Sequence, residues 1–282
     1  MLFVSVFAAL HTVAPFELSA GSLTTWVVAV LGHDAAYYVF HRASHRVNVL
    51  WAAHVVHHQS ERYDFTVSLR QGAVATWISY AFYLPLALLI DAQVFLAVHA
   101  AYQVYQFFVH TRAVRRLGPL GCLATPSHHR VHHGSERLHL DRNYGGFFIL
   151  FDRLLDTFRG EVREPRYGVP GGFDRVSPLF ANTYMFARLV AASRTLSGRT
   201  LVQLWLGPPE ASAHLLSAAG HAPSAVGRAS LRRTWLPGIL GCAGTLVIAF
   251  AREPIPLGVV VLIGVASVVL IEVASAPLDR RA

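Results

Sequence analysis

Residues 33–58, HDAAYYVFHRASHRVNVLWAAHVVHH, decide how the rest of this 282-residue chain is interpreted. Six histidines stand in this stretch, and a second block at 126–133, PSHHRVHH, contains four more. A further histidine, His110, ends an apolar run between the two blocks. Because histidine is the commonest metal ligand in proteins, histidines at this density predict a metal site.

The spacing of these histidines is typical of helix faces. His41 and His45 are four residues apart, and both blocks contain the pattern H-x2-H-H. Residues three and four apart lie on one face of a helix, so each group brings its imidazoles together. Eight histidines at these spacings, with His110, exceed the ligands that one zinc-like ion accepts, which predicts two metal ions. Imidazole suits iron, zinc, copper and nickel alike, so the ligand type does not name the metal.

Four residues near these histidines are interpreted either as additional ligands or as hydrogen-bond partners of the ligands. Gln106 lies one helical turn before His110, and His128 adjoins another histidine of the second block. Asp34 precedes His41 by seven residues, so it is expected on the same helix face, accepting an imidazole N–H. A plain polar contact without a metal role is the alternative. The four residues are His33, Asp34, Gln106 and His128.

The composition favours a membrane protein. Apolar residues make up 54% of the chain and charged residues only 14%. The positive charge is carried by arginine alone, and these arginines flank the apolar runs. That placement favours membrane orientation over nucleic-acid binding. Cys122 and Cys242 have neither metal-ligand spacing nor the density of a disulfide scaffold, so histidine has to carry the site.

The apolar runs predict an all-α fold, an integral membrane helical bundle with four core transmembrane helices and two C-terminal ones. A cytosolic helical cap is expected to carry the histidine-rich di-metal site. The core runs are 2–16, 22–40, 72–90 and 93–110, and the C-terminal runs are 236–251 and 255–276. The first run is short for a full span. Alternation of the spans places the arginine-rich segments, and the histidine clusters with them, on the cytoplasmic side.

Three regions are predicted along the chain. Residues 1–160 form the di-metal membrane domain, 161–235 a cytosolic or interfacial segment, and 236–282 a C-terminal transmembrane hairpin. Within the middle region, TYMFARLVAASRTL at 183–196 is amphipathic and is expected to lie on the membrane surface. His99, alone in an apolar run, is interpreted as a packing residue.

Other catalytic motifs are absent from the sequence. There is no H-E-x-x-H zincin motif, no P-loop, no dinucleotide fingerprint and no G-x-S-x-G elbow. The Glu-x-x-His motif, which soluble di-iron proteins use in pairs, occurs once, at 136–139. Reducing equivalents are therefore expected from a separate protein or a diffusible reductant.

Taken together, these motifs resemble the fatty acid hydroxylase/sterol desaturase superfamily of membrane di-iron enzymes. The resemblance rests on H-x3-H followed by two H-x2-H-H boxes beside apolar helices. HDAAYYVFHRASH at 33–45, TPSHHRVHHG at 125–134 and DRNYGGFFILFDRLLDTF at 141–158 are most similar to the alkylglycerol monooxygenase branch. The similarity covers about residues 32–160.

This resemblance implies a non-haem di-iron centre that uses O2 to hydroxylate or desaturate an unactivated lipid C–H bond. In the branch, tetrahydrobiopterin is the reductant, and hydroxylation of an alkylglycerol leads to cleavage of its ether. The implied partners are a bilayer lipid, O2 and an electron donor, without nucleic acid. Carried onto this chain, the implied ligands of the two iron ions are His41, His45, His54, His57, His58, His110, His129, His132 and His133.

Aromatic residues near the ligands are expected to wall a lipid channel, with core packing or interfacial anchoring as the alternative for each. They are Tyr37, Tyr38, Trp51, Tyr102, Tyr105, Phe107 and Phe108. Other functions stay open: a sterol, fatty-acid or carotenoid desaturase or hydroxylase, a histidine-rich metal transporter, or a structural zinc scaffold. Histidines at and beyond the ends of the apolar runs disfavour transport, which uses ionisable groups within spans.

Overall fold

The computed structural model describes residues 2–218, except Glu17, Pro119, Leu120, Gly171 and 174–176, together with Val265, Ala266 and Val269. The regular structure of these residues is helical, and their β contact is an isolated bridge between Leu123 and Phe148. The all-α class predicted from the sequence is therefore confirmed for this part of the chain. The predicted C-terminal hairpin at 236–282 lies outside the described residues.

The first half of the fold contains α1 (Leu2–His11), α2 (Leu23–Arg46), α3 (Asn48–His58), α4 (Phe65–Leu69), α5 (Ala75–Tyr83), the 3-10 helix η1 (Leu84–Leu88) and α6 (Ala92–Val109). Of these, α1, α2, α5, η1 and α6 overlap the predicted apolar runs, whereas α3 and α4 lie between two of the runs. The second half contains α7 (Pro126–His132), α8 (Leu150–Leu154), α9 (Pro178–Ser193), α10 (Gly198–Leu206) and α11 (Pro209–Ala218). Among the described helices, none has both the length and the apolar character of a membrane span.

Helix α2 extends past the end of the predicted apolar run. The Ser22 side chain caps it by accepting the Thr24 amide, and the helix continues to Arg46. Neither glycine nor proline occurs between 33 and 46, so nothing in the sequence interrupts its hydrogen bonds. It ends at Val47, which is extended with φ −125°. The helix thereby carries two of the motif histidines on its last turns.

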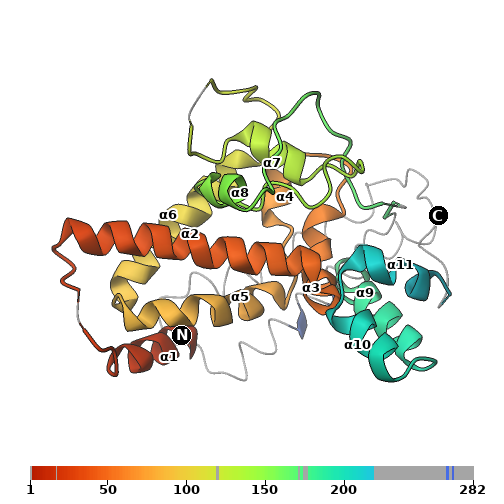
Figure 1. The fold of residues 1–282 in the computed structure, drawn as a ribbon, viewed down its shortest axis with the longest axis horizontal. Coiled ribbons are helices and arrows are strands. Elements are labelled where there is room, and N and C mark those ends of the chain that lie inside the picture. The colour runs from red at the N-terminus through yellow and green to blue at the C-terminus, as the bar shows by residue number, and fades with distance from the viewer. Residues whose placement is uncertain are drawn as a thin grey trace.

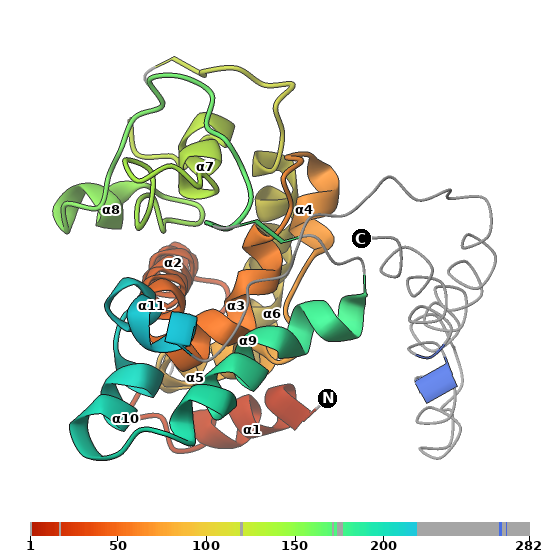
Figure 2. The ribbon, with the colours of Figure 1, turned by 90° about the vertical axis from the view of Figure 1, so that its right-hand side faces the viewer.

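Helix α2 separates two layers of the molecule. Helices α1 and α5 lie on one side of it, and α7 and α8 lie on the other (Figures 1 and 2). On the first side, Phe7 of α1, Ala29 of α2, Leu86 of η1 and Phe95 of α6 are buried in one apolar core. The clustered histidines lie on the second side, between α2, α3 and α7.

Helices α9–α11 pack against α3. Met185 and Leu189 of α9 share a buried apolar cluster with Val55 of α3 and Leu204 of α10. The amphipathic segment at 183–196 therefore buries apolar side chains against α3, a packing partner that the sequence analysis did not predict. This packing holds the face of α3 opposite to its histidines.

Candidate metal centre

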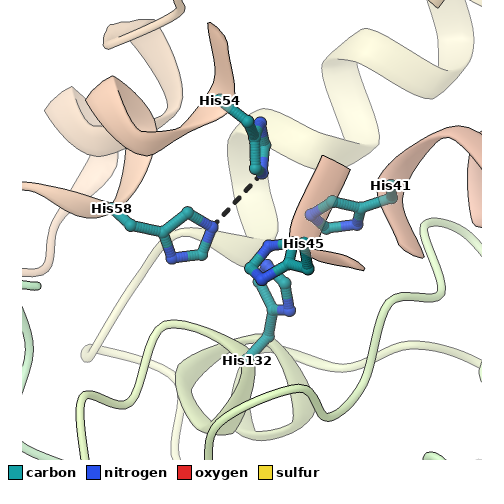
Figure 3. Close-up of side chains that lie close together, drawn as sticks. All are labelled: His41, His45, His54, His58 and His132. Atoms are coloured by element: carbon teal, nitrogen blue, oxygen red, sulfur yellow. Dashed lines mark hydrogen bonds between the residues drawn. The ribbon is translucent and has the colours of Figure 1, made fainter. Parts of the chain in front are cut away.

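Nine buried histidines gather in two adjacent groups between α2, α3, the end of α6, and α7. Within each group, every member offers a nitrogen that lies within 4.8 Å of those of the others. The five-histidine cluster comprises His41, His45, His54, His58 and His132, which converge in Figure 3. The four-histidine cluster comprises His57, His110, His129 and His133. These are the nine residues that the sequence analysis assigned as ligands.

Helix geometry explains how the H-x2-H-H boxes divide between the clusters. Residues four apart differ by about 40° around a helix, so His54 and His58 point into the same cluster. The middle histidine of each box is about 100° around the helix from the last one. His57 and His132, the middle members, therefore enter the other cluster. The clusters adjoin, since the rings of His58 and His133 are 4.4 Å apart between centroids.

Backbone carbonyls orient four of the rings. Each of these rings has its Nδ1 within hydrogen-bond distance of a carbonyl oxygen: His41 with Tyr144 (2.8 Å), His57 with Arg70 (3.2 Å), His110 with Gln106 (2.6 Å) and His132 with Arg142 (3.0 Å). A carbonyl only accepts, so Nδ1 carries the proton and Nε2 keeps the lone pair. Metal-binding histidines are held in this way, with the second nitrogen fixed by a hydrogen bond.

The nitrogen atoms that face one another fit a bound cation. Nε2 of His57 lies 3.2 Å from Nε2 of His110, and both atoms carry lone pairs in the tautomers just assigned. Buried Nε2 atoms of His41, His45 and His132 have no hydrogen-bond partner among the described residues. Two nitrogens bound to one ion at about 2.1 Å lie ~3.0–3.4 Å apart. The donor set therefore fits a pair of transition-metal ions.

Burial keeps the imidazoles neutral, which is the form that binds metal. It lowers the pKa of His57 to about 4. Burial, followed by the charge repulsion of neighbouring histidines, also holds the pKa values of His58, His132 and His133 well below the usual range. Protons therefore compete weakly for these nitrogens at neutral pH.

Asp152 positions the carbonyl that orients His41. Its carboxylate is buried and accepts the backbone amides of Tyr144 (2.8 Å) and Gly145 (2.7 Å). The Thr157 hydroxyl donates to the same carboxylate at 2.6 Å. Asp152 thus holds the start of the 144–148 loop against α2, and sequence reasoning had not singled it out.

Asp34 holds the other end of the same loop. It accepts the Tyr102 hydroxyl at 2.7 Å and the Phe147 amide at 2.8 Å. The predicted contact between Asp34 and His41 is therefore wrong, because the loop takes the carboxylate and a carbonyl takes Nδ1 of His41. A Cβ at Gly146 would collide with the Tyr102 hydroxyl, so the close approach of the loop to α6 requires glycine.

His128 also lies outside both clusters, and Gln106 lines the cavity with His110. The Gln106 side chain donates to the Gly146 carbonyl at 2.6 Å, which makes it a support of the 144–148 loop. The His128 ring accepts the Thr125 amide at 3.2 Å and so caps the N-terminus of α7. Both side chains form hydrogen bonds with the backbone.

His33 pairs with His99 instead of joining the clusters. Nε2 of His33 lies 3.0 Å from Nδ1 of His99, and His33 is fully buried. His99 packs as predicted, with its ring stacked on Phe95 at 5.4 Å, and it has this polar contact in addition. The pair could not be predicted from the sequence, because its members are on different helices.

A buried ion pair stabilises the four-histidine cluster. Arg130 on α7 binds Glu161 through Nε to Oε1 (2.7 Å) and Nη2 to Oε2 (2.8 Å). Its Nη1 donates to the carbonyls of Thr111 (2.9 Å) and Val114 (2.7 Å). These bonds tie α7 to the segment that follows His110, so they hold the two halves of the cluster together.

A cavity of about 540 Å³ opens onto both clusters. His41 and His54 line it from the five-histidine cluster, and His57 and His110 from the four-histidine cluster. The rest of its wall comes mainly from α5 and α6. This volume lies within the range of small-molecule and cofactor sites.

The predicted aromatic wall is present in part. Tyr37, Phe107 and Phe108 line the cavity. The other four aromatic residues make contacts elsewhere: Tyr38 with Thr157, Trp51 with the His45 ring, Tyr102 with Asp34, and Tyr105 with the Ala124 carbonyl. The aromatic positions were visible in the sequence, but their directions follow from how the helices pack.

Residues 26–157 match the family model described as fatty acid hydroxylase. The resemblance drawn from the histidine boxes is thereby confirmed. The matched segment includes α2 to α7 and the 144–148 loop, which together provide all nine clustered histidines.

The chain is also similar to individual proteins. The chain is 44% identical over 166 residues to the alkylglycerol monooxygenase of Homo sapiens, which covers 58% of this chain and 37% of that protein. It is 49% identical over 155 residues to the Danio rerio alkylglycerol monooxygenase, covering 54% and 34%. An ornithine lipid hydroxylase of Rhizobium tropici is 32% identical over 140 residues, covering 49% and 42%. The chain thus spans less than half the length of these relatives, and no solved structure matches it significantly.

Proposed function

We propose that this chain is a membrane-bound oxidoreductase that uses O2 and two iron ions to hydroxylate a lipid C–H bond. The observation that carries the proposal is the opening of two buried, carbonyl-oriented histidine clusters onto one cavity. Similarity to alkylglycerol monooxygenases supports an alkylglycerol ether lipid as the substrate. Hydroxylation of the ether-bearing carbon would lead to ether cleavage.

In this proposal the nine clustered histidines hold the two ions through Nε2 or Nδ1. Iron bound there would supply O2 activation and the oxidising power for the C–H bond. The protein contributes neutral, pre-oriented ligands and a shielded site that keeps bulk water away. The sequence has no nicotinamide-binding motif, so the proposal requires an external reductant. The resemblance to the alkylglycerol monooxygenase branch implies that this reductant is tetrahydrobiopterin.

The cavity wall suits an alkyl chain beside the clusters. Phe40, Leu69, Val104 and Phe107 are among its lining residues. Burial of an alkyl chain against such side chains contributes about 0.8 kcal/mol for each CH₂ group. This contribution favours binding of a long-chain lipid over a small polar substrate.

Exposed apolar side chains support a membrane location. Trp77 on α5 is 62% exposed, and Val104 and Phe108 on α6 are each 58% exposed. Apolar residues gathered on a surface mark contact with a membrane or a partner. We propose a multi-pass membrane protein with the three regions predicted from the sequence and the histidine clusters on the cytoplasmic side.

The test uses the purified full chain loaded with iron. We expect about two iron ions per chain, and release of a fatty aldehyde from 1-O-hexadecylglycerol that requires both O2 and tetrahydrobiopterin. Aldehyde release by metal-free protein at the full rate would refute the proposal. Metal uptake into vesicles without lipid oxidation would instead favour the transporter alternative.

The similarity to an ornithine lipid hydroxylase supports a second candidate within the same chemistry. In that case oxygen enters a lipid chain that has no adjacent ether, and the product is a stable hydroxylated lipid. Incubation with a panel containing ornithine lipid, a sterol, a fatty acyl lipid and a carotenoid distinguishes the candidates, because only ether cleavage releases aldehyde.

A further inference from the structure

Three helices bring polar side chains together in the part of the cavity wall remote from the clusters. His33 of α2, Tyr83 of α5 and His99 of α6 form this group, which we call the polar end. Tyr83 and His99 line the cavity, and His33 stacks on the Tyr83 ring at 4.6 Å. Along α2, His33 precedes His41 by eight residues, which is roughly 12 Å of helix.

The pairing of the two histidines determines where their protons lie. Nδ1 of His33 is buried and has no partner among the described residues. A buried N–H without a partner is rarer than an unused acceptor, so the proton of His33 belongs on Nε2, donating to Nδ1 of His99 at 3.0 Å. The proton of His99 is then on Nε2, where the described part of the chain offers it no hydrogen-bond acceptor.

Tyr83 adds a second unused donor at this end of the cavity. Its ring is buried, with 3% exposed, and no described residue forms a hydrogen bond with its hydroxyl. Ser79, one turn earlier on the same helix and also in the cavity wall, donates its hydroxyl to the Thr76 carbonyl and keeps lone pairs free to accept. The polar end therefore offers two donors and an acceptor.

The polar end carries no formal charge when its histidines are neutral. Among the described residues, neither an arginine nor an acidic residue lines the cavity, and the sequence contains no lysine. A phosphate would lose its water there without gaining a cation, which is costly. A hydroxyl group would exchange its water for the donors of Tyr83 and His99 and for the acceptor of Ser79.

We propose that the polar end binds the hydroxyl groups of an uncharged lipid headgroup and so sets which carbon lies beside the clusters. The inference deepens the proposed function, on which it rests for the identity of the substrate. In this arrangement the glycerol unit lies between the polar end and the clusters, with the ether-bearing carbon nearest His41. Neutral alkylglycerols are then preferred over their phosphorylated forms.

The test is equilibrium binding of lipid probes to the metal-free full chain in neutral detergent micelles. The probes are 1-O-hexadecylglycerol, hexadecyl methyl ether without hydroxyls, and 1-O-hexadecylglycerol 3-phosphate. Wild-type protein should bind the glycerol ether most tightly. Tyr83→Phe and His99→Phe should each raise its Kd about three- to tenfold and leave the Kd of the methyl ether unchanged.

Tyr80→Phe is the matched control, because Tyr80 is on the same helix, stacks on Phe3 at 4.1 Å and does not line the cavity. Tyr83→Phe keeps the His33–His99 pair intact, so it tests the polar end even where His99→Phe does not fold. The inference would be overturned if the variants weakened binding of the glycerol ether and the methyl ether equally, or if neither variant changed binding. Tight binding of the phosphate probe to the wild-type protein would also overturn it. Because binding is measured without metal, selectivity for hydroxyls would stand even where iron-dependent turnover is not found.

Discussion

The five-histidine and four-histidine clusters use the same residue and the same helix spacings, but different groups hold them in place. Behind the five-histidine cluster, the buried carboxylates of Asp34 and Asp152 bind amides of the 144–148 loop, which orients His41. Behind the four-histidine cluster, Arg130 pairs with Glu161 and also joins α7 to the chain after α6 through the Thr111 and Val114 carbonyls. The clusters therefore adjoin but have separate supports, so each can be disturbed without direct damage to the other.

Removing one ligand from each cluster should have the largest effect. His129→Ala leaves three histidines in its cluster, whereas His45→Ala leaves four in the other. Loss of a group that merely orients a ligand costs about 10–100-fold, so loss of a ligand should lower lipid oxidation more than about hundredfold in both variants. We expect His129→Ala to lose one ion outright and His45→Ala to retain a weakly bound one.

Metal analysis and turnover of the iron-loaded variants measure these outcomes. His11→Ala is the control, because His11 lies outside both clusters and contacts the Ala87 carbonyl. Retention of two tightly bound ions by His129→Ala would show that the four-histidine cluster is not a metal site.

Breaking the Arg130–Glu161 ion pair should disturb the four-histidine cluster more than the five-histidine cluster. The side chains of Arg130 and Glu161 are only 5% and 7% exposed. Arg130→Met leaves the buried Glu161 carboxylate with only the longer Arg116 contact at 3.9 Å, which should lower the free energy of unfolding by about 3–5 kcal/mol. Denaturant unfolding measures the change, and Arg153→Met, an exposed arginine over the Phe158 ring, is the control. A loss equal to that of the control would contradict the role given to the pair.

Acid should destabilise the metal-free protein through its buried histidines. The pKa of His57 is lowered to about 4, so between pH 6.5 and 4 the unfolded chain binds more protons than the folded one. The free energy of unfolding therefore keeps its full value above pH 6.5 and falls as the pH drops through this window. From pH 7 to 4.5 His57 alone should contribute about 2–3 kcal/mol to the loss. His57→Gln should reduce the pH dependence of the free energy of unfolding. An unchanged pH dependence would show that His57 is not buried in its neutral form.

The smallest effect is expected from the loop that supports the five-histidine cluster. Asp152→Asn replaces one acceptor oxygen by a donor that faces a backbone amide. Metal affinity of this cluster should fall about 10–100-fold while the four-histidine cluster keeps its ion. Stepwise metal titration measures both affinities, with the exposed Asp156→Asn as the control. Equal weakening of both clusters would show that their supports are not separate.

Local spacing was enough to identify the ligand set. The H-x3-H and H-x2-H-H patterns picked out eight of the clustered histidines, and His110 was found at the end of its apolar run. Residues in one helix have a known angular relation, so their convergence can be predicted without knowing the fold. The apolar runs likewise predicted α2, α5 and α6, whose ends differ from the runs by a few residues.

The supporting groups could not be found in this way. The carbonyls of Tyr144, Arg70 and Arg142 carry no side-chain signature, since every residue has a carbonyl. Asp34 was placed on the correct helix but with the wrong partner, because its partner is a loop more than one hundred positions later in the chain. Arg130 was read only as one of many arginines, although it is among the most buried.

Helix periodicity in the sequence predicts that histidines four apart face a common point and that apolar runs form helices near them. The packed fold divides the nine histidines into groups of five and four, fixes the tautomers of four rings through carbonyls, and opens both groups onto one cavity. The physical reason is the range of the interactions. Helix periodicity is local, whereas the division of the ligands depends on how α2, α3, α6 and α7 pack together.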